Sequence, residues 1–358
     1  EIMRPLVAEI RLAHLRHNYR VLKEMHGQNL LAVVKADAYG HGAVQCAKAL
    51  DDMADGFAVA FLEEAVTLRE NGIKSPILLL EGVFEPHEYA LVEQYGLWTV
   101  IHQQTQLEDC LAHDWKQPAT VWLKMDSGMH RAGFFPHNYA AAYHALQQSP
   151  KIGKIVKMTH FSCADDAERG MTEMQIDTFD TACEGLGGDS SLANSAAILA
   201  YPEARREWGR AGLALYGVSP FAAGAGCFEA DLKPVMRVAS QVFAERVLQP
   251  HEPIGYGASF YTKRSTRVGL VACGYADGYP RNAPTDTPVF INGMRSRLIG
   301  RASMDMLTVD LSHVPADSAY EVELFGDCVS INELAQSAGH IPYEILCHIK
   351  RMRRVYQA

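Results

Sequence analysis

Short apolar runs alternate with longer amphipathic stretches through the first 230 residues of the chain. The runs with the length of buried strands are residues 31–35, 57–60, 77–80, 98–101, 120–124, 155–159 and 191–193. Stretches between them, such as Ala43–Leu50 and residues 171–186, carry apolar residues at helical spacing. Because continuously apolar strands are typical of parallel sheets covered on both faces by helices, the pattern predicts seven βα repeats.

An eighth strand would close these repeats into a barrel, and two segments are candidates for it, residues 205–211 and residues 212–217. Either choice gives an α/β fold of the (β/α)8 TIM-barrel type. A doubly wound open sheet is the structural alternative at this point.

The pattern changes after the repeats. Residues 219–234 are rich in glycine, alanine and proline, which is typical of a linker. β-rich runs follow, at residues 235–248, 267–273, 288–291, 306–311 and 321–325. We therefore expect an N-terminal barrel domain at residues 1–230 and a mostly β C-terminal domain at residues 231–358.

Charge and composition narrow the possible partners. The chain of 358 residues has a formal net charge of −9, which argues against nucleic acid because phosphate binding requires a basic surface. No apolar run has the length of a membrane span, so no membrane partner is expected. The eight cysteines are scattered without the Cys/His spacing of a metal site, so we expect no metal ion and no disulfide scaffold. Reduced cysteines are typical of a cytoplasmic protein.

The segment "AVVKADAYGHG" places Lys35 at the end of the first predicted strand, which in a barrel is the catalytic face. A lysine after a strand is more often a solvated loop residue, but Gly40 and Gly42 permit a close turn here, and Tyr39 can place a hydroxyl beside it. A lysine in a pocket can form a Schiff base and can act as a base. Pyridoxal phosphate (PLP) is a cofactor that uses both properties.

PLP also requires a phosphate site and a partner for its pyridine nitrogen. Asn194 and Ser195 end the seventh predicted strand and open a helix, where free amides and a hydroxyl suit an anion. Gly212 and Leu213 would open another short helix just after Arg210. Barrels often hold phosphate in the loops after their last two strands. An ordinary helix cap is the alternative explanation for Ser195.

Eight segments between residues 32 and 310 together resemble the alanine racemase family. In order they are "AVVKADAYGHG", "MDSGMHRAGF", "MTHFSCAD", "LANSAA", "GRAGLALYG", "IGYGASF", "VACGYADGYPR" and "GRASMDMLTVD". The intervening segments fit as well, so the resemblance covers essentially the whole chain. Asp37 departs from the asparagine of many members, at a position that does not take part in the chemistry. The resemblance implies a PLP-binding barrel followed by a β domain, with the eighth strand near residues 207–210.

The resemblance also implies a reaction, the interconversion of L-alanine and D-alanine by two bases on opposite faces of the substrate. Lys35 would bind PLP and act as one base. Tyr256 would act as the other, from the partner subunit of a homodimer with shared active sites. Arg210 would face the pyridine nitrogen, and His160 would bridge Arg210 and Tyr256.

Further roles follow from the same resemblance. The phosphate site would comprise Tyr39, Asn194, Ser195, Gly212, Leu213 and Tyr356. Arg131 would contact the cofactor and the substrate carboxylate, which also receives the backbone amide of Met304 from the partner subunit. Tyr275 and Asp305 would line the passage through which substrate arrives. Lys124, which is carbamylated in many relatives, would steady Arg131.

Three competing functions are consistent with parts of this pattern. An amino-acid decarboxylase of the same architecture would be expected to place a carboxylate at the pyridine nitrogen, where this chain has Arg210. A non-catalytic PLP carrier would lack the β domain and the opposing tyrosine. A racemase of broader specificity is compatible with the passage residues. Whether the enzyme supplies D-alanine for peptidoglycan or serves alanine catabolism is not encoded in these motifs.

Overall fold

The computed structural model of the chain describes residues 4–221 and 230–358, which form two compact units. We call Leu15–Ala38 together with the described residues of Gly42–Leu232 the barrel unit. The described residues up to His14, together with Tyr39–His41 and Lys233–Ala358, are called the β unit. The expected linker at 219–234 includes residues 222–229, which lie outside the described residues, and the expected domain boundary at 230–231 follows them directly.

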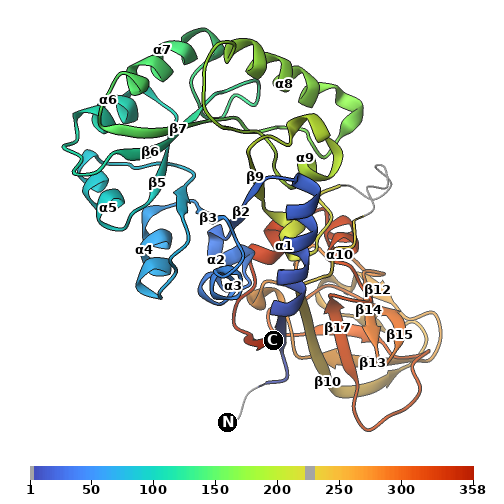
Figure 1. The fold of residues 1–358 in the computed structure, drawn as a ribbon. Helices are drawn as coiled ribbons and strands as arrows, with labels where there is room; N and C mark the ends of the chain where they lie inside the picture. The colour runs from blue at the N-terminus through green and yellow to red at the C-terminus, as the bar shows by residue number, and fades with distance from the viewer. Residues whose placement is uncertain (1–3, 222–229) are drawn as a thin grey trace. The chain divides into compact units, whose positions relative to one another are not determined.

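The strands of the barrel unit close into a parallel barrel in chain order (Figure 1). They are β2 (Asn29–Val33), β3 (Gly56–Val59), β4 (Ile77–Leu79), β5 (Trp98–Ile101), β6 (Ala119–Lys124), β7 (Ile152–Met158), β8 (Ser190–Ser191) and β9 (Trp208–Ala211). The first and last strands pair with Asn29 opposite Trp208, which closes the sheet. The predicted (β/α)8 barrel is therefore confirmed, the open sheet is excluded, and the eighth strand lies within residues 205–211.

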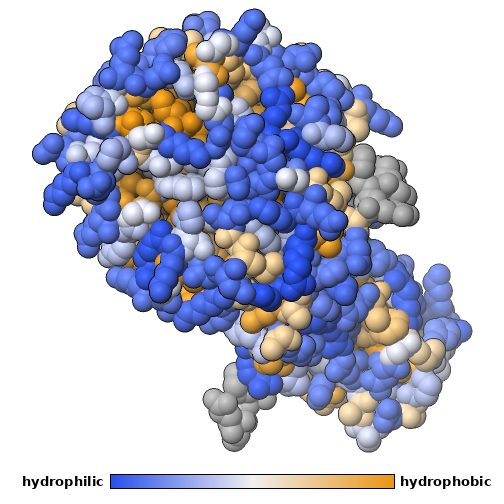
Figure 2. Space-filling model, viewed as in Figure 1, coloured by the Kyte–Doolittle hydropathy of each residue, from blue (hydrophilic) through white to orange (hydrophobic). Residues whose placement is uncertain are grey.

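Helices follow the strands and pack around them, as Figure 1 shows. They are α1 (Leu12–His26), α3 (Ala43–Leu50), α4 (Leu62–Glu70), α5 (Tyr89–Gln94), α6 (Gln104–Ala112), α7 (Pro136–Gln147), α8 (Met171–Ala182) and α9 (Ser195–Ala200). In Figure 2 the outward faces of these helices are largely hydrophilic, and hydrophobic side chains show beneath α6 and α7. This separation is what the alternation of apolar and amphipathic stretches predicts.

Aromatic side chains fill part of the barrel interior. The ring of Trp98 on β5 lies 5.4 Å from that of Trp208 on β9, and the ring of Trp122 on β6 lies 5.7 Å from it. Since β9 is not a neighbour of β5 or β6 in the sheet, these rings meet across the interior. The interior is packed at this level, and in such barrels ligands bind at the strand ends.

The β unit is built on an eight-stranded sheet. Its strands are β1 (Val7–Arg11), β10 (Met236–Leu248), β13 (Thr266–Val271), β14 (Pro288–Ile291), β15 (Met294–Arg297), β16 (Leu307–Asp310), β17 (Glu321–Phe325) and β18 (Arg353–Gln357). A small pair, β11 (Pro253–Ile254) and β12 (Phe260–Tyr261), and two helices, α10 (Ile331–Ala338) and α11 (Pro342–Cys347), complete it. The prediction of a mostly β C-terminal region is confirmed.

The N-terminal strand β1 is paired on both of its edges. It runs antiparallel to β10, with Val7 opposite Ala239, and parallel to β18, with Val7 opposite Arg353. The first strand of the chain is thus part of the C-terminal sheet. Across residues 4–221 and 230–358, no helix has the length and apolar character that crossing a bilayer requires.

Candidate active site

Lys35 lies two residues after the end of β2, and the backbone then makes a left-handed turn, which carries the label α2 (Lys35–Tyr39) in Figure 1. Ala36, Asp37, Ala38 and Tyr39 all have φ angles between 50° and 54°. Residues other than glycine rarely adopt this region, at a cost on the order of 1 kcal/mol each. Backbone strain of this kind clusters at functional sites, where the surroundings hold a side chain in one direction.

Glu64, at the start of α4, holds this turn. Its Oε1 accepts a hydrogen bond from the Ala36 amide at 2.8 Å, and its Oε2 accepts from the amides of Ala60 and Phe61 at 2.8 and 2.9 Å. Sequence reasoning did not identify Glu64 as part of the site. A glutamate in the first turn of a helix is a visible capping signal, but the contact with the Lys35 turn depends on the fold.

Basic side chains from several strand ends gather in the barrel unit. Lys124 ends β6 and is 7% exposed. Burial, followed by the positive charges of Arg131, Arg210 and Lys35, lowers its pKa to about 8. His160 follows β7, and burial together with the same cations lowers its pKa well below the usual value. Because the same charges act on both groups, these five side chains share one region of the barrel.

Arg210 on β9 is buried without a carboxylate partner in the described part of the chain. Its Nη1 donates to Ser191 Oγ at 2.6 Å, and its Nη2 donates to the Thr159 carbonyl at 2.8 Å and to His160 Nδ1 at 3.2 Å. Burial lowers its pKa to about 10, so the guanidinium stays charged at neutral pH. His160 accepts at Nδ1, which leaves its other ring nitrogen to carry the proton.

The expected phosphate residues of the barrel unit lie together at the ends of the last two strands. Ser195 Oγ accepts hydrogen bonds from the amides of Gly212 at 2.9 Å and Ala214 at 3.1 Å. The cap of α9 is Asn194, whose Oδ1 accepts from the Ala197 amide at 3.1 Å. Ser195 is therefore not a simple cap, because its hydroxyl joins α9 to the short turn after Arg210 that begins at Leu213.

The other expected site residues belong to the β unit. Tyr256, 71% exposed, lines an open cavity of about 510 Å³ together with Met304 and Asp305. The Tyr275 amide donates to the Ser303 carbonyl at 3.0 Å, so Tyr275 adjoins this segment. The β unit thus brings Tyr256, Met304, Asp305 and Tyr275 together. Lys35 and Tyr256 belong to different units.

Tyr39 and Tyr356, both expected at the phosphate, also belong to the β unit. The Tyr356 hydroxyl donates to the His41 carbonyl at 3.0 Å, which connects β18 to the segment that follows the Lys35 turn. Tyr39 is buried with its ring 5.9 Å from that of Tyr343, and burial raises the pKa of its hydroxyl.

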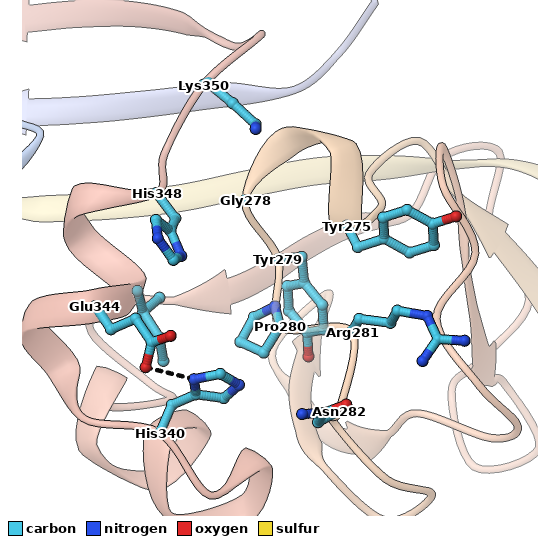
Figure 3. A pocket seen from close by; sticks show the side chains of 11 residues that line it. Tyr275, Gly278, Tyr279, Pro280, Arg281, Asn282, His340, Glu344, His348 and Lys350 are labelled. Atoms are coloured by element: carbon cyan, nitrogen blue, oxygen red, sulfur yellow. Dashed lines mark hydrogen bonds and ion pairs between the residues drawn. The ribbon is translucent and has the colours of Figure 1, made fainter.

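A second cavity of the β unit, of about 320 Å³, is shown in Figure 3. His340 and Glu344 on its wall are joined by a 2.6 Å contact between Nδ1 and Oε2, and His348 follows on the same wall. Although this spacing suggests a metal site, no group of ligands in residues 4–221 and 230–358 could hold a metal ion. Arg281 extends away from these groups, toward the ring of Tyr275 at 6.0 Å, so the charged side chains do not converge.

The donor set of the barrel unit defines a class of protein. Arg210 is a buried cation without a carboxylate partner in the described part of the chain, and with the buried Lys124 nearby it favours an anionic ligand. The Ser195 hydroxyl, whose oxygen accepts from two backbone amides and whose hydrogen can donate, suits a phosphate group, and a lysine lies just after the first barrel strand. These features fit a barrel enzyme that binds a phosphate-bearing cofactor beside a reactive lysine.

Comparison with known proteins identifies the family. The family model described as "Alanine racemase, N-terminal domain" matches residues 10–220, and "Alanine racemase, C-terminal domain" matches residues 235–356. This chain belongs to the alanine racemase family. The resemblance carried by the eight sequence segments is confirmed.

Individual relatives match over nearly their whole length. An alanine racemase of Neisseria meningitidis serogroup A is 63% identical over 354 residues, which is 99% of each chain. A protein of Pseudomonas putida named "Alanine racemase, catabolic" is 52% identical over 355 residues, again 99% of each. The crystal structure of the biosynthetic alanine racemase from Pseudomonas aeruginosa has a TM-score of 0.95 at 44% identity, covering 99% of this chain and all of that one.

Proposed function

We propose that this chain interconverts L-alanine and D-alanine with PLP bound through Lys35, and that Lys35 and Tyr256 act as the two bases. The observation that carries the proposal is the buried, carboxylate-free Arg210 beside the Ser195 phosphate site, in a chain whose relatives are alanine racemases. When bound, PLP would draw electrons from the α-carbon and so acidify its proton. The phosphate would be held by Tyr39, Asn194, Ser195, Gly212, Leu213 and Tyr356.

Arg210 favours racemisation over the competing reactions. Its guanidinium remains protonated at neutral pH and can only donate a hydrogen bond to the pyridine nitrogen. A carboxylate at this position would instead stabilise the protonated form of that nitrogen and so strengthen the electron withdrawal, which favours decarboxylation or transamination. The hydrogen bonds from Arg210 to Ser191, Thr159 and His160 hold the guanidinium in the wall of the barrel.

The two bases would serve opposite faces of the substrate. Racemisation removes the α-proton on one face and returns a proton on the other, which one side chain cannot easily do. Lys35 is held by its left-handed turn, and Tyr256 stands exposed on the β unit, so its hydroxyl can reach a ligand outside its own unit. Arg131 and the Met304 amide would hold the substrate carboxylate between them.

We further propose that Lys124 carries a carbamate in the working enzyme. A pKa of about 8 leaves about a tenth of the amine neutral at pH 7, far more than for an ordinary lysine, and the neutral amine is the form that reacts with CO₂. The resulting anion would face Arg131, Arg210 and Lys35, so the charges that disfavour the ammonium would favour the carbamate. Arg131 would then be steadied by an ion pair.

Chiral analysis tests the reaction. Incubation of the purified protein with L-alanine should yield equal amounts of both enantiomers, and borohydride reduction should fix PLP on one lysine, Lys35. Attachment of the reduced cofactor to any other lysine would contradict the assignment. A panel of larger amino acids would distinguish an alanine racemase from a racemase of broad specificity.

Assembly requires a separate test, because Tyr256 and Met304 are proposed to come from the partner subunit of a homodimer. A chain with Lys35→Ala should be mixed with a chain with Tyr256→Phe after separate purification. In a closed two-fold dimer with shared sites, the heterodimer contains one intact site and should regain activity. No regained activity in verified heterodimers would mean that each site is built from one chain. The cytoplasmic location stays a prediction that fractionation of cells would check.

A further inference from the structure

Asp277, in the β unit, is a fully buried carboxylate that has no role in the proposed reaction. It ends the short helix η6 (Tyr275–Asp277), two residues after the passage residue Tyr275. Its Oδ2 accepts hydrogen bonds from Arg4 Nη1 at 3.0 Å and from the Gly274 amide at 2.9 Å, and its Oδ1 contacts Arg4 Nη2. A buried charge is tolerated when it is paired in this way.

Arg351 connects Asp277 to a second carboxylate. Its Nε lies 3.4 Å from Asp277 Oδ1, and its Nη2 donates to Asp305 Oδ1 at 2.8 Å. Arg351 has a φ angle of 55°, a left-handed conformation that residues other than glycine adopt only when contacts hold them there. The positive charges of Arg4 and Arg351 are balanced by the negative charges of Asp277 and Asp305. Asp305 is thus the second carboxylate that this network requires for neutrality.

The backbone around Arg351 is fixed against the same helix. The Lys350 amide donates to the Asp277 carbonyl at 3.1 Å. A Cβ atom on Gly278 would lie 2.1 Å from the His348 carbonyl oxygen, so glycine is required for this close approach. Figure 3 shows the backbone from His348 to Lys350 beside the turn that carries Gly278. The position of Arg351 is therefore set by η6.

The same short helix also fixes the segment of Met304. The Tyr275 amide donates to the Ser303 carbonyl and the Ala276 amide to the Met304 carbonyl, each at 3.0 Å. A Cβ atom on Gly274 would lie only 2.2 Å from the Met304 carbonyl oxygen. Met304 is thus held from one side by the backbone of η6, and its neighbour Asp305 is held from the other by Arg351.

We propose that Asp277 is a positioning residue, which through Arg351 and the backbone of η6 fixes Met304 and Asp305. The Met304 amide is then aimed at the substrate carboxylate, and Asp305 is held where it narrows the passage. This inference rests on the proposed function, because the roles of Met304 and Asp305 do. It assigns to Asp277, Arg4 and Arg351 an effect on substrate binding rather than on proton transfer.

The test is a set of kinetic constants for L-alanine. Arg351→Met removes the bridge and keeps the length of the side chain, and it should raise KM about two- to fivefold, the effect of one partly exposed ion pair, with kcat nearly unchanged. Asp277→Asn, which removes the charge that both arginines contact, should raise KM by about tenfold or more. Arg353→Met is the matched control, since Arg353 is an exposed arginine of the same segment outside this network. Its KM should equal that of the wild type.

A double-mutant cycle separates positioning from general destabilisation. If Arg351 acts through Asp305, then Arg351→Met should have no further effect on KM in an Asp305→Asn background. Equal effects in both backgrounds would overturn the proposal, as would an unchanged KM in Arg351→Met. Arg351→Lys keeps the charge but lacks the planar guanidinium whose Nε and Nη2 reach the two carboxylates from separate atoms, so full recovery of KM in this variant would also contradict the bridge.

Hydrogen exchange gives a readout that does not depend on activity. The amides of residues 303–306 should exchange faster in Arg351→Met and in Asp277→Asn than in the wild type or in Arg353→Met. Unchanged exchange would refute the positioning role even in an active enzyme. If the wild type does not racemise alanine, the proposed function fails, whereas exchange in residues 303–306 still decides whether Asp277 fixes this segment.

Discussion

Lys124 should be the lysine of this chain that forms a carbamate, and the structure provides a matched lysine that should not. Both Lys124 on β6 and Lys157 on β7 are buried barrel residues with lowered pKa values. The Lys157 ammonium donates to the carbonyls of residues 186, 187 and 188 at 2.9, 2.7 and 2.8 Å. These carbonyls favour the charged form of Lys157, whereas Lys124 lies near Arg131, Arg210 and Lys35, whose positive charges outweigh the negative charge of Glu81 and disfavour its ammonium.

The size of the effect follows from the two pKa values of the amine. At pH 8 an ordinary lysine with a pKa of 10.5 is about 0.3% neutral, whereas a pKa of about 8 leaves about half of Lys124 neutral. The neutral form is thus enriched by about two orders of magnitude, which corresponds to about 3 kcal/mol against the buried ammonium. Carbamate formation should rise as the pH increases toward and through 8.

The assay is ¹³C NMR of the enzyme in ¹³C-bicarbonate. One slowly exchanging carbamate signal should appear in the wild type, persist in Lys157→Met and vanish in Lys124→Met. A signal that survives in Lys124→Met, or that is lost only in Lys157→Met, would refute the reasoning from charge and burial.

The same shift makes a prediction about stability. The folded state releases the Lys124 proton near pH 8, whereas the unfolded chain keeps it up to about pH 10.5, so stability should rise with pH between these values. In buffer free of CO₂ at pH 7, Lys124→Met should therefore unfold at a higher urea concentration than the wild type. The free energy of unfolding should be higher by up to about 3 kcal/mol. This gain should shrink at pH 10, and an equal gain at both pH values would contradict the shifted pKa.

Three further substitutions have distinct expected outcomes. Tyr256→Phe should lower racemisation by about 10²–10⁴-fold with PLP still bound, and thermal unfolding should stay unchanged because the side chain is exposed. Ser195→Ala removes the acceptor of two buried amides, so urea unfolding should show that the free energy of unfolding falls by about 1–3 kcal/mol. Equilibrium dialysis should show a lower affinity for PLP. Gly274→Ala should displace the Met304 carbonyl, so KM for L-alanine should rise while PLP absorbance is retained. An unchanged KM would show that the close approach of Gly274 to Met304 does not affect substrate binding.

Local pattern was sufficient for most strands of the barrel. The predicted runs at residues 57–60, 98–101 and 120–124 overlap β3, β5 and β6 closely, because continuously apolar strands leave a strong local signal. Lys35 was found for the same reason, since a charged residue at the end of such a run is conspicuous. The eighth strand was ambiguous because it is short and is interrupted by Gly209 and Arg210. Its place was settled by the closing pair of β9 with β2.

Most site roles came from the resemblance, and the arrangement of the groups came from the fold. Nothing in the local pattern indicates that Ser191 and Thr159 hold Arg210, or that Glu64 holds the Lys35 turn, because these contacts join residues 19, 51 and 28 positions apart. The lowered pKa of Lys124 likewise depends on burial and on charges from other strands. Such effects exist only once the strand ends are brought together.

The sequence by itself determined the class of fold, the position of the reactive lysine and the family, because each depends on residues close together in the chain or on ordered motifs. Only the tertiary structure decided that β1 joins the C-terminal sheet and that Arg4 and Arg351 meet on Asp277, 273 positions from Arg4. The physical reason is that strand partners and buried ion pairs are chosen by long-range geometry. A strand's backbone groups must form hydrogen bonds and a buried charge must be paired. The sequence around them does not specify which distant residue provides the partner.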